Sequence, residues 1–334
     1  MCSPAHKNGK SNMKKRKLGN SGLELAPLAL GGNVFGWTLD EPASFQVLDA
    51  FVAAGFNFVD TADMYSTWKP GNKGGESETI LGNWMKKSGN RKKVLIATKV
   101  GRDMGAGRKG LSKDYILRAA EDSLRRLQTD YVDLYQAHTD DATVALQETL
   151  EAFGQLVKQG KVRAIGASNY SAPRLSEALD TSKKHGLPRY ESLQPLYNLY
   201  DRADYESTLA PVCRENGIGV IPYYSLASGF LSGKYRSEAD LEKSARGGGV
   251  KKYLNARGFR ILEALDKTAK KYNSTPAKVS LAWLLTRPTI TAPIASATNV
   301  TQLRELLDAT ELKLDRDSVE LLDQASASQA SATQ

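Results

Sequence analysis

Four side chains that can transfer protons stand at or near the ends of short apolar runs in the sequence: Asp60, Tyr65, Lys99 and His138. The interval from Asp60 to Lys99 and the interval from Lys99 to His138 are both 39 residues. An interval of this size matches one strand, one helix and their loops. We therefore expect Asp60, Lys99 and His138 at the same end of three successive parallel strands. With Tyr65 in the loop after the first strand, the four residues would form one site.

Tyrosine is a weak acid with a reference pKa near 10, and it needs a nearby positive charge to release its proton at neutral pH. At about 4 Å and an effective dielectric constant near 20, a lysine cation would stabilise the phenolate by about 4 kcal/mol, or about three pKa units. A buried lysine stays charged only beside an anion, and Asp60 is well placed to be that anion. The pattern therefore predicts that Lys99, held by Asp60, lowers the pKa of Tyr65.

Tyr65 would then donate a proton to a substrate oxygen, while a neutral His138 donates a hydrogen bond to the same oxygen. Such general acid catalysis is typical of carbonyl reduction. No side chain supplies a hydride, so a nicotinamide cofactor is also required. Two alternatives stay open: Asp60 and Lys99 could be a structural ion pair, or Lys99 could form a Schiff base with a carbonyl substrate.

The bulk composition indicates a soluble globular protein. The chain has 334 residues, of which 41% are hydrophobic and 25% charged, and this length suits one α/β barrel. The net charge of +9 is scattered, without a basic run interleaved with aromatics, and no apolar segment is long enough to span a membrane. We therefore expect neither a nucleic-acid nor a membrane partner. The expected partner is the small carbonyl substrate, and the expected state is a monomer or weak homo-oligomer.

Only two cysteines are present, Cys2 and Cys213, and they are far apart in the sequence. They support neither a disulfide framework nor a metal site, so we expect no metal and a cytoplasmic location.

Eight short apolar runs alternate with segments of helical periodicity. The runs are Pro27–Leu30, Phe56–Val59, Val94–Thr98, Val132–Ala137, Val162–Ala167, Ser192–Leu193, Gly219–Pro222 and Ile290–Ala295. They predict an α/β fold, a (β/α)8 TIM barrel with an N-terminal β-hairpin and a long loop, residues 226–253, before the last strand. A doubly wound sheet is the less favoured alternative, because no G-x-G-x-x-G motif follows a strand. We expect one domain over residues 14–323, with flexible tails at 1–13 and 324–334.

Longer motifs around the four residues resemble the aldo-keto reductase superfamily, from Leu18 to about Leu312. The motifs are Asn57–Tyr65, Gly75–Glu78, Ile96–Lys99, Asp133–His138 and Ile165–Tyr170. The resemblance implies an (α/β)8 barrel that binds NADP(H), with Asp60, Tyr65, Lys99 and His138 matching the family's catalytic tetrad. Within the family, Tyr223–Leu231 looks like the bacterial-type branch that reduces varied aldehydes.

The resemblance also implies a set of cofactor-binding residues. These are Ser168, Asn169 and Gln194 for the carboxamide, Tyr223 for stacking on the nicotinamide, Leu226, Ser228, Gly229 and Lys234 for the pyrophosphate, and Ser296, Thr298, Gln302 and Glu305 for the adenosine end.

The segment 295–299 contains no Arg or Lys, although the family commonly places there the cation that recognises the 2′-phosphate of NADP. We expect Lys234, Arg236, Lys252 or Arg257 to supply this charge from the long loop, and NADPH as the cofactor, with NADH as the alternative. Trp37 and Trp68 are predicted to line the substrate pocket.

These observations predict an NADPH-dependent oxidoreductase that reduces aldehydes to alcohols, with ketones or sugar aldehydes as further candidates. The alternative is a cofactor-sensing regulatory subunit, resembling the potassium-channel β subunits of the same superfamily. Residues 1–13 look short and featureless for the partner-directed extension that such a subunit would carry.

Overall fold

The computed structural model describes residues 13–327, and it begins with the predicted hairpin. Strand β1 (Arg16–Lys17) pairs antiparallel with β2 (Glu24–Leu25). Gly19 lies in the turn with a φ of 52°, and a Cβ atom there would lie 2.2 Å from the Glu191 carbonyl oxygen. Only glycine allows this approach, so the hairpin packs closely on the barrel.

Eight parallel strands form the barrel, and each predicted run overlaps one of them. They are β3 (Ala29–Gly31), β4 (Phe58–Asp60), β5 (Leu95–Val100), β6 (Val132–Ala137), β7 (Val162–Ser168), β8 (Tyr190–Gln194), β9 (Gly219–Val220) and β10 (Ile294–Ala295). Their order in the sheet is β10-β3-β4-β5-β6-β7-β8-β9. A parallel bridge between Val220 and Ile290 joins the two edges, and Ile294 N donates to the Pro222 carbonyl. The predicted (β/α)8 barrel is therefore confirmed.

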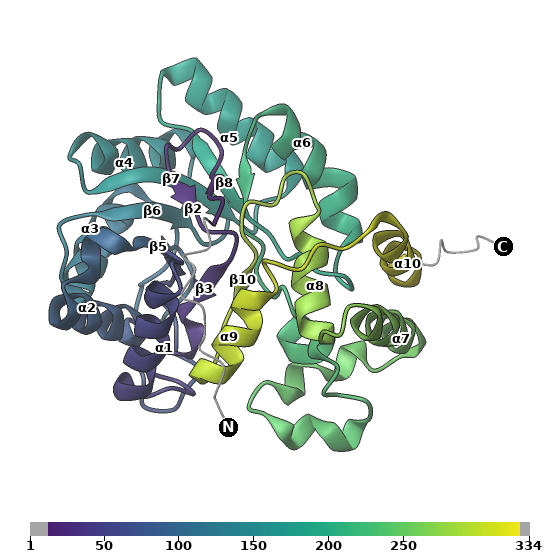
Figure 1. Cartoon of the computed structure of the whole chain (residues 1–334). Coiled ribbons are helices and arrows are strands. Elements are labelled where there is room, and N and C mark those ends of the chain that lie inside the picture. Colours follow the sequence, from purple (N-terminus) through teal and green to yellow (C-terminus); the bar gives the residue numbers. More distant parts are fainter. Residues whose placement is uncertain (1–12, 328–334) are drawn as a thin grey trace.

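Helices cover the outside of the strands (Figure 1). They are α1 (Glu41–Ala53), α2 (Glu76–Ser88), α3 (Lys113–Leu127), α4 (Leu146–Lys158), α5 (Ala172–His185), α6 (Ala210–Glu215), α7 (Ala256–Lys271), α8 (Pro276–Leu285), α9 (Val300–Asp308) and α10 (Arg316–Ser326). Ser171 and Thr275 cap the first turns of α5 and α8, since their hydroxyls accept from Arg174 N and Lys278 N. Ser112 precedes α3, but its side chain makes no cap hydrogen bond.

Two apolar layers hold the barrel together. Inside the barrel, inward-facing strand residues such as Phe58, Ala97 and Leu134 pack against the leucines of the hairpin, so the hairpin closes one end of the barrel. These leucines are Leu18, Leu23 and Leu25. Outside, the helices bury a larger layer against the strands. Because the hairpin occupies the opposite end, the carboxyl ends of the strands are left as the open face of the barrel.

The long segment after β9 is built from short 3₁₀ turns. The turns are η4 (Ala227–Ser232), η5 (Glu238–Lys243), η6 (Gly247–Gly249) and η7 (Lys251–Tyr253). Phe230, Tyr235 and Tyr253 are fully buried, and the Phe230 and Tyr253 rings are stacked 5.3 Å apart. The predicted loop therefore has its own apolar anchors, and helices α7 and α8 follow it before β10.

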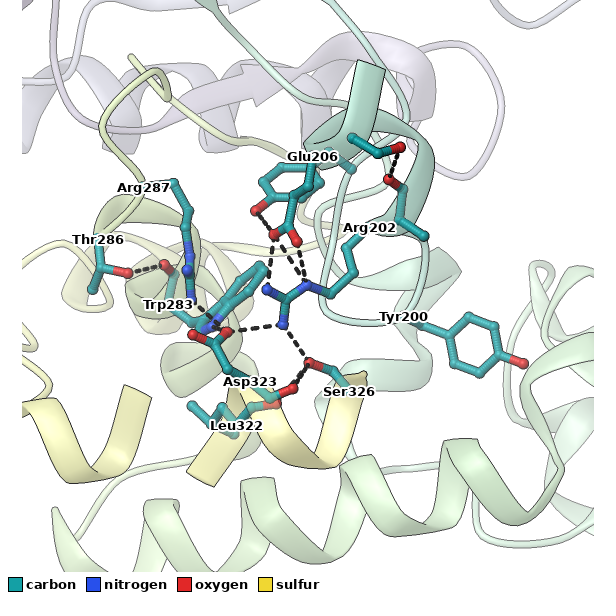
Figure 2. Close-up of polar contacts among 12 residues, drawn as sticks. Tyr200, Arg202, Glu206, Trp283, Thr286, Arg287, Leu322, Asp323 and Ser326 are labelled. Carbon is teal, nitrogen blue, oxygen red and sulfur yellow. Dashed lines mark hydrogen bonds and ion pairs between the residues drawn. The ribbon is translucent and has the colours of Figure 1, made fainter. Parts of the chain in front are cut away.

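Helix α10 ends at Ser326, so residues 324–326, which were expected in the flexible C-terminal tail, belong to the helix instead. Arg202 donates to Asp323 and to the Ser326 hydroxyl, and it also pairs with Glu206 (Figure 2). Arg287 and the Trp283 indole nitrogen contact the same Asp323 carboxylate. These contacts come from distant parts of the chain and leave no local sequence signal. The rest of the two expected tails, except Met13 and Ala327, lies outside the described residues.

Candidate active site

The centre of the site is the ion pair between Asp60 and Lys99. Asp60 ends β4 and Lys99 lies in the neighbouring strand β5, so both side chains reach the open face of the barrel. Lys99 Nζ lies 2.7 Å from Asp60 Oδ2, and the side chains are 0% and 1% exposed. Lys99 also donates to the Thr61 carbonyl at 2.8 Å. Asp60 Oδ1 is held separately by Gln194 Nε2 at 2.9 Å. The carboxylate is therefore fixed on both oxygens.

Tyr65 lies in the loop after β4 and joins this pair. Lys99 Nζ donates to the Tyr65 hydroxyl oxygen at 2.8 Å, and the hydroxyl donates to Asp60 Oδ2 at 3.1 Å. The ammonium nitrogen also lies 4.5 Å from the centre of the Tyr65 ring. The structure thus brings together the three residues that the sequence suggested.

The predicted direction of the Tyr65 pKa is wrong. Burial and the neighbouring Asp60 carboxylate raise the pKa of Tyr65 well above 10. The lysine cation alone would lower this pKa, but the Asp60 carboxylate that holds the lysine lies within hydrogen-bond distance of the same hydroxyl. Burial also lowers the pKa of Lys99, and Asp60 opposes that effect. Tyr65 therefore carries its proton at neutral pH, which is the form a proton donor needs.

His138 follows β6 and faces the same space. Its backbone N–H donates to the Val100 carbonyl at 2.8 Å, and its ring centre lies 6.1 Å from that of Tyr65. Burial lowers the pKa of His138 well below 6.5, and the positive charges of Lys99 and Arg102 act in the same direction. The imidazole is therefore neutral at physiological pH, as expected from the sequence. Its Nδ1 atom is buried and has no hydrogen-bond partner within residues 13–327.

Asp60, Tyr65 and His138 border a cavity of about 840 Å³ at the carboxyl ends of the strands. Lys99 does not line it, because the lysine is fully buried behind Asp60 and Tyr65. The cavity is large enough for a dinucleotide or drug-sized ligand.

A second group on the cavity wall contains amide and hydroxyl side chains. Asn169, with a φ of 55°, donates to the His138 carbonyl and to the Ser168 hydroxyl, and it accepts from the Tyr223 hydroxyl at 2.7 Å. Gln194 already uses its NH₂ group on Asp60 and Gln136. Its carbonyl oxygen is therefore the atom that can accept from a carboxamide.

The residues predicted for the pyrophosphate lie together after β9. Leu226, Ser228, Gly229 and Lys234 all line the cavity. Ser228 and Gly229 have φ values of 59° and 98°, which turn the backbone sharply at this point. Lys234 is exposed, and within the described residues no carboxylate lies within ion-pair distance of it. The segment thus presents a cation and a tight turn to the cavity.

The residues predicted for the adenosine end also line the cavity. Ser296 donates to Asn33 Oδ1 at 2.6 Å, and Thr298 donates twice to Gln302. Glu305 accepts from the Thr275 hydroxyl at 2.6 Å. These contacts place the four residues at one end of the cavity, bordered by β10 and α9.

The two predicted tryptophans differ in their positions. Trp68 lines the cavity and is 43% exposed. Trp37 packs edge-on against Trp68, with ring centres 5.7 Å apart, and is not itself among the lining residues. Trp37 therefore supports the pocket wall rather than forming it.

Comparison with known proteins assigns the chain to a family. Residues 27–327 match the model of the aldo/keto reductase family. The chain belongs to the aldo/keto reductase family. This confirms the resemblance seen in the sequence motifs.

Several relatives of this aldo/keto reductase are similar along nearly their whole length. It is 35% identical to the uncharacterized oxidoreductase YrpG of Bacillus subtilis, over 93% of this chain and 95% of the relative. It is 33% identical to Protein tas of Escherichia coli, over 91% and 95%. A putative aryl-alcohol dehydrogenase of Schizosaccharomyces pombe is 32% identical, over 92% and 94%. Membership of this family identifies the chain as an oxidoreductase that uses a nicotinamide cofactor and acts on a small carbonyl compound.

The cavity wall contains three cations that the sequence did not single out: Arg102, Lys243 and Arg246. Arg246, in the segment after β9, lines the cavity, donates to Asn33 and lies over the Trp37 ring with its guanidinium carbon 5.6 Å from the ring centre. Within residues 13–327, no acidic side chain pairs with it. Its position depends on how an irregular segment folds back over the barrel, which no periodicity in the sequence reveals.

Three of the four cations that the sequence offered for the 2′-phosphate are engaged elsewhere. Arg236 pairs with Asp266, and Arg257 donates to the Tyr200 and Ser326 carbonyls. Lys252 lies over the Tyr253 ring. Lys234 alone of the four lines the cavity, and Arg246 joins it there.

Neither a metal centre nor a membrane span emerges from the part of the chain that is described. No group of three or more His, Cys, Asp or Glu residues within 13–327 could hold a metal ion. No helix in the same range is long and apolar enough to cross a membrane.

Proposed function

We propose that this aldo/keto reductase is an NADPH-dependent enzyme that reduces aldehydes to alcohols, with Tyr65 as the proton donor. The observation that carries the proposal is the position of Lys99 Nζ, within 2.8 Å of both the Asp60 carboxylate and the Tyr65 hydroxyl, behind the wall of a large cavity. A bound nicotinamide would supply the hydride in this reaction.

Side chains of the protein would carry out the remaining steps, which are proton transfer, charge stabilisation and orientation of the substrate. As the carbonyl oxygen gains negative charge, Tyr65 gives it the phenolic proton. Lys99, kept charged by Asp60, then stabilises the phenolate left on Tyr65 at 2.8 Å. Neutral His138 donates a hydrogen bond to the same oxygen and so orients the substrate.

The cavity wall provides groups suited to a nicotinamide dinucleotide. The Gln194 carbonyl oxygen would accept from the carboxamide, and Ser168 and Asn169 form a hydrogen-bonded pair beside it. Tyr223 would stack on the nicotinamide ring. Lys234 and Arg246, two cations at the phosphate-binding side, favour the additional phosphate of NADPH over NADH.

Aldehydes carried on an aromatic ring are the substrates that we propose. Trp68 and Tyr224, the latter 50% exposed, give the cavity mouth aromatic faces. One relative is named a putative aryl-alcohol dehydrogenase, which is the same reaction class in the opposite direction.

The test is the Tyr65→Phe variant, assayed with NADPH and a panel of aldehydes. Removal of the proton donor should lower kcat by about 10²–10⁴-fold. Binding of NADPH, measured by fluorescence titration with NADH as the comparison, should stay close to wild type. Retained turnover in Tyr65→Phe would contradict the proposal. A covalent adduct on Lys99 trapped by borohydride would instead support a Schiff-base reaction.

A further inference from the structure

The cavity holds more positive charge than its own carboxylates balance. Asp60 is paired with Lys99, and Glu305 is bonded to Thr275. Four further cations line the cavity. Lys243 is paired with Asp240, whereas within residues 13–327 Arg102, Lys234 and Arg246 have no acidic partner within ion-pair distance. The last two, on the segment after β9, are already proposed to hold cofactor phosphates.

Arg102 follows a strand that lies opposite, in the barrel, the strand that precedes those two residues. It follows β5, whereas Lys234 and Arg246 follow β9, and the two strands are four places apart in a closed ring of eight. The cofactor phosphates would lie along the β9 and β10 side, beside Lys234 and Ser296. Arg102 is therefore left without a role in cofactor binding.

Arg102 lines the same cavity as Tyr65, His138 and Tyr223. Burial lowers the pKa of His138, and the charge of Arg102 acts in the same direction. Burial raises the pKa of Tyr223, and the charge of Arg102 opposes that effect. The Arg102 side chain makes no hydrogen bond within the described residues and is exposed at the mouth, where solvent or a substrate can reach it.

We infer that Arg102 recognises a carboxylate on the substrate, so that the preferred substrates are aromatic aldehydes bearing a carboxylate. A guanidinium binds a carboxylate through two parallel hydrogen bonds, and Trp68 and Tyr224 offer faces for the intervening ring. This inference rests on the proposed reductase function, because it concerns the substrate of the same site.

The experiment compares two substrates of similar shape, 4-carboxybenzaldehyde and its neutral methyl ester, with NADPH as reductant. Wild-type enzyme should show a higher kcat/KM for the acid. Arg102→Gln should lower kcat/KM for the acid about tenfold or more, mainly by raising KM, because the variant loses a charge-assisted hydrogen bond to the carboxylate. The value for the ester should change less than about twofold. Added salt should reduce the preference of the wild type for the acid.

Arg108→Gln is the matched control. Arg108 lies on the same loop, but it bonds to the Lys73 and Met104 carbonyls and does not line the cavity. This variant should keep the preference for the acid. Equal rates with acid and ester in the wild type, or an equal loss of both in Arg102→Gln, would overturn the role of Arg102 while leaving the reductase intact. If the wild type reduced neither of these two aldehydes and none of a panel of uncharged aldehydes, the proposed function itself would be overturned.

Discussion

The Lys99 ammonium nitrogen lies 2.7 Å from Asp60 Oδ2, in a place where neither side chain is more than 1% exposed. Burial alone would drive the lysine to its neutral form, and the carboxylate opposes this effect. The charge of Lys99, and with it the hydrogen bond to Tyr65, therefore depends on Asp60. The two residues come from adjacent strands, so the barrel register fixes the distance between them.

Asp60→Asn should impair proton donation by Tyr65, although Tyr65 itself is unchanged. Asparagine removes the negative charge that raises the pKa of Lys99, so Lys99 should lose its proton at a lower pH in the variant. Activity that depends on charged Lys99 falls as pH rises through the pKa of that residue. The fall in kcat/KM should therefore begin at a lower pH than in the wild type, and pH–rate profiles from pH 6 to 10 measure the shift.

Asp133→Asn is the control for the loss of a buried carboxylate. Asp133 is also 1% exposed, but it pairs with Arg91 and Arg163 on the outer side of β6. This variant should lower thermal stability and leave the shape of the pH–rate profile unchanged. Identical profiles in the wild type and Asp60→Asn would count against the dependence of Tyr65 on this ion pair.

Arg246→Met should weaken NADPH binding. The guanidinium is the second unpaired cation on the phosphate side of the cavity, and loss of a charge-assisted hydrogen bond should raise Kd by about tenfold or more. A larger effect on NADPH than on NADH would assign Arg246 to the 2′-phosphate, and an equal effect would assign it to the pyrophosphate. Arg236→Met, which removes an exposed partner of Asp266, is the control. An unchanged Kd for both cofactors in Arg246→Met would exclude the residue from phosphate binding.

The sequence predicted the barrel and the meeting of Asp60, Lys99 and His138 because both depend on regular spacing. In a parallel barrel each βα unit returns the chain to the same face, so equal intervals between strand ends place side chains together. The position of Tyr65 in the site could be predicted from that of Asp60, because only a short loop separates the two residues.

The sequence could not predict features that depend on irregular segments or on exact distances. Arg246 reaches Asn33 across 213 positions of the chain, through a segment of 3₁₀ turns that has no repeating pattern. The sign of the Tyr65 pKa shift depends on the 3.1 Å contact with Asp60, which residue spacing does not contain. The end of α10 depends on arginines that lie far from it in the sequence.

Arg202→Met should loosen α10. Arg202 is 12% exposed and joins Glu206, Asp323 and Ser326, so its loss leaves two partly buried carboxylates with fewer partners. We expect unfolding free energy to fall by about 2–4 kcal/mol. Urea unfolding measures this change, and limited proteolysis should cleave within Arg316–Ser326 first. Arg125→Met, which removes an exposed pair with Asp122, should change stability by about 0.5 kcal/mol or less. Equal stability of Arg202→Met and the wild type would show that the contacts of Arg202 do not stabilise α10.

Asp63→Asn should stabilise the protein increasingly as the pH rises. Both carboxylate oxygens of Asp63 are buried without a hydrogen-bond partner in residues 13–327, and burial, followed by the charge of Glu78, raises its pKa to about 8. Between pH 4, near the pKa of an unfolded aspartate, and pH 8, the native state keeps a proton that the unfolded state has lost. Raising the pH across this range therefore favours unfolding of the wild type.

Asparagine has no such proton to hold, so the difference in unfolding free energy between Asp63→Asn and the wild type should grow from pH 4 to pH 8. The growth should be on the order of a few kcal/mol, measured by urea unfolding at several pH values. Asp133→Asn, which removes a carboxylate paired with two arginines, should instead be less stable than the wild type throughout this range. A constant difference between Asp63→Asn and the wild type would mean that Asp63 is ionised in the native protein, held by the nearby charges of Arg126 and Lys99.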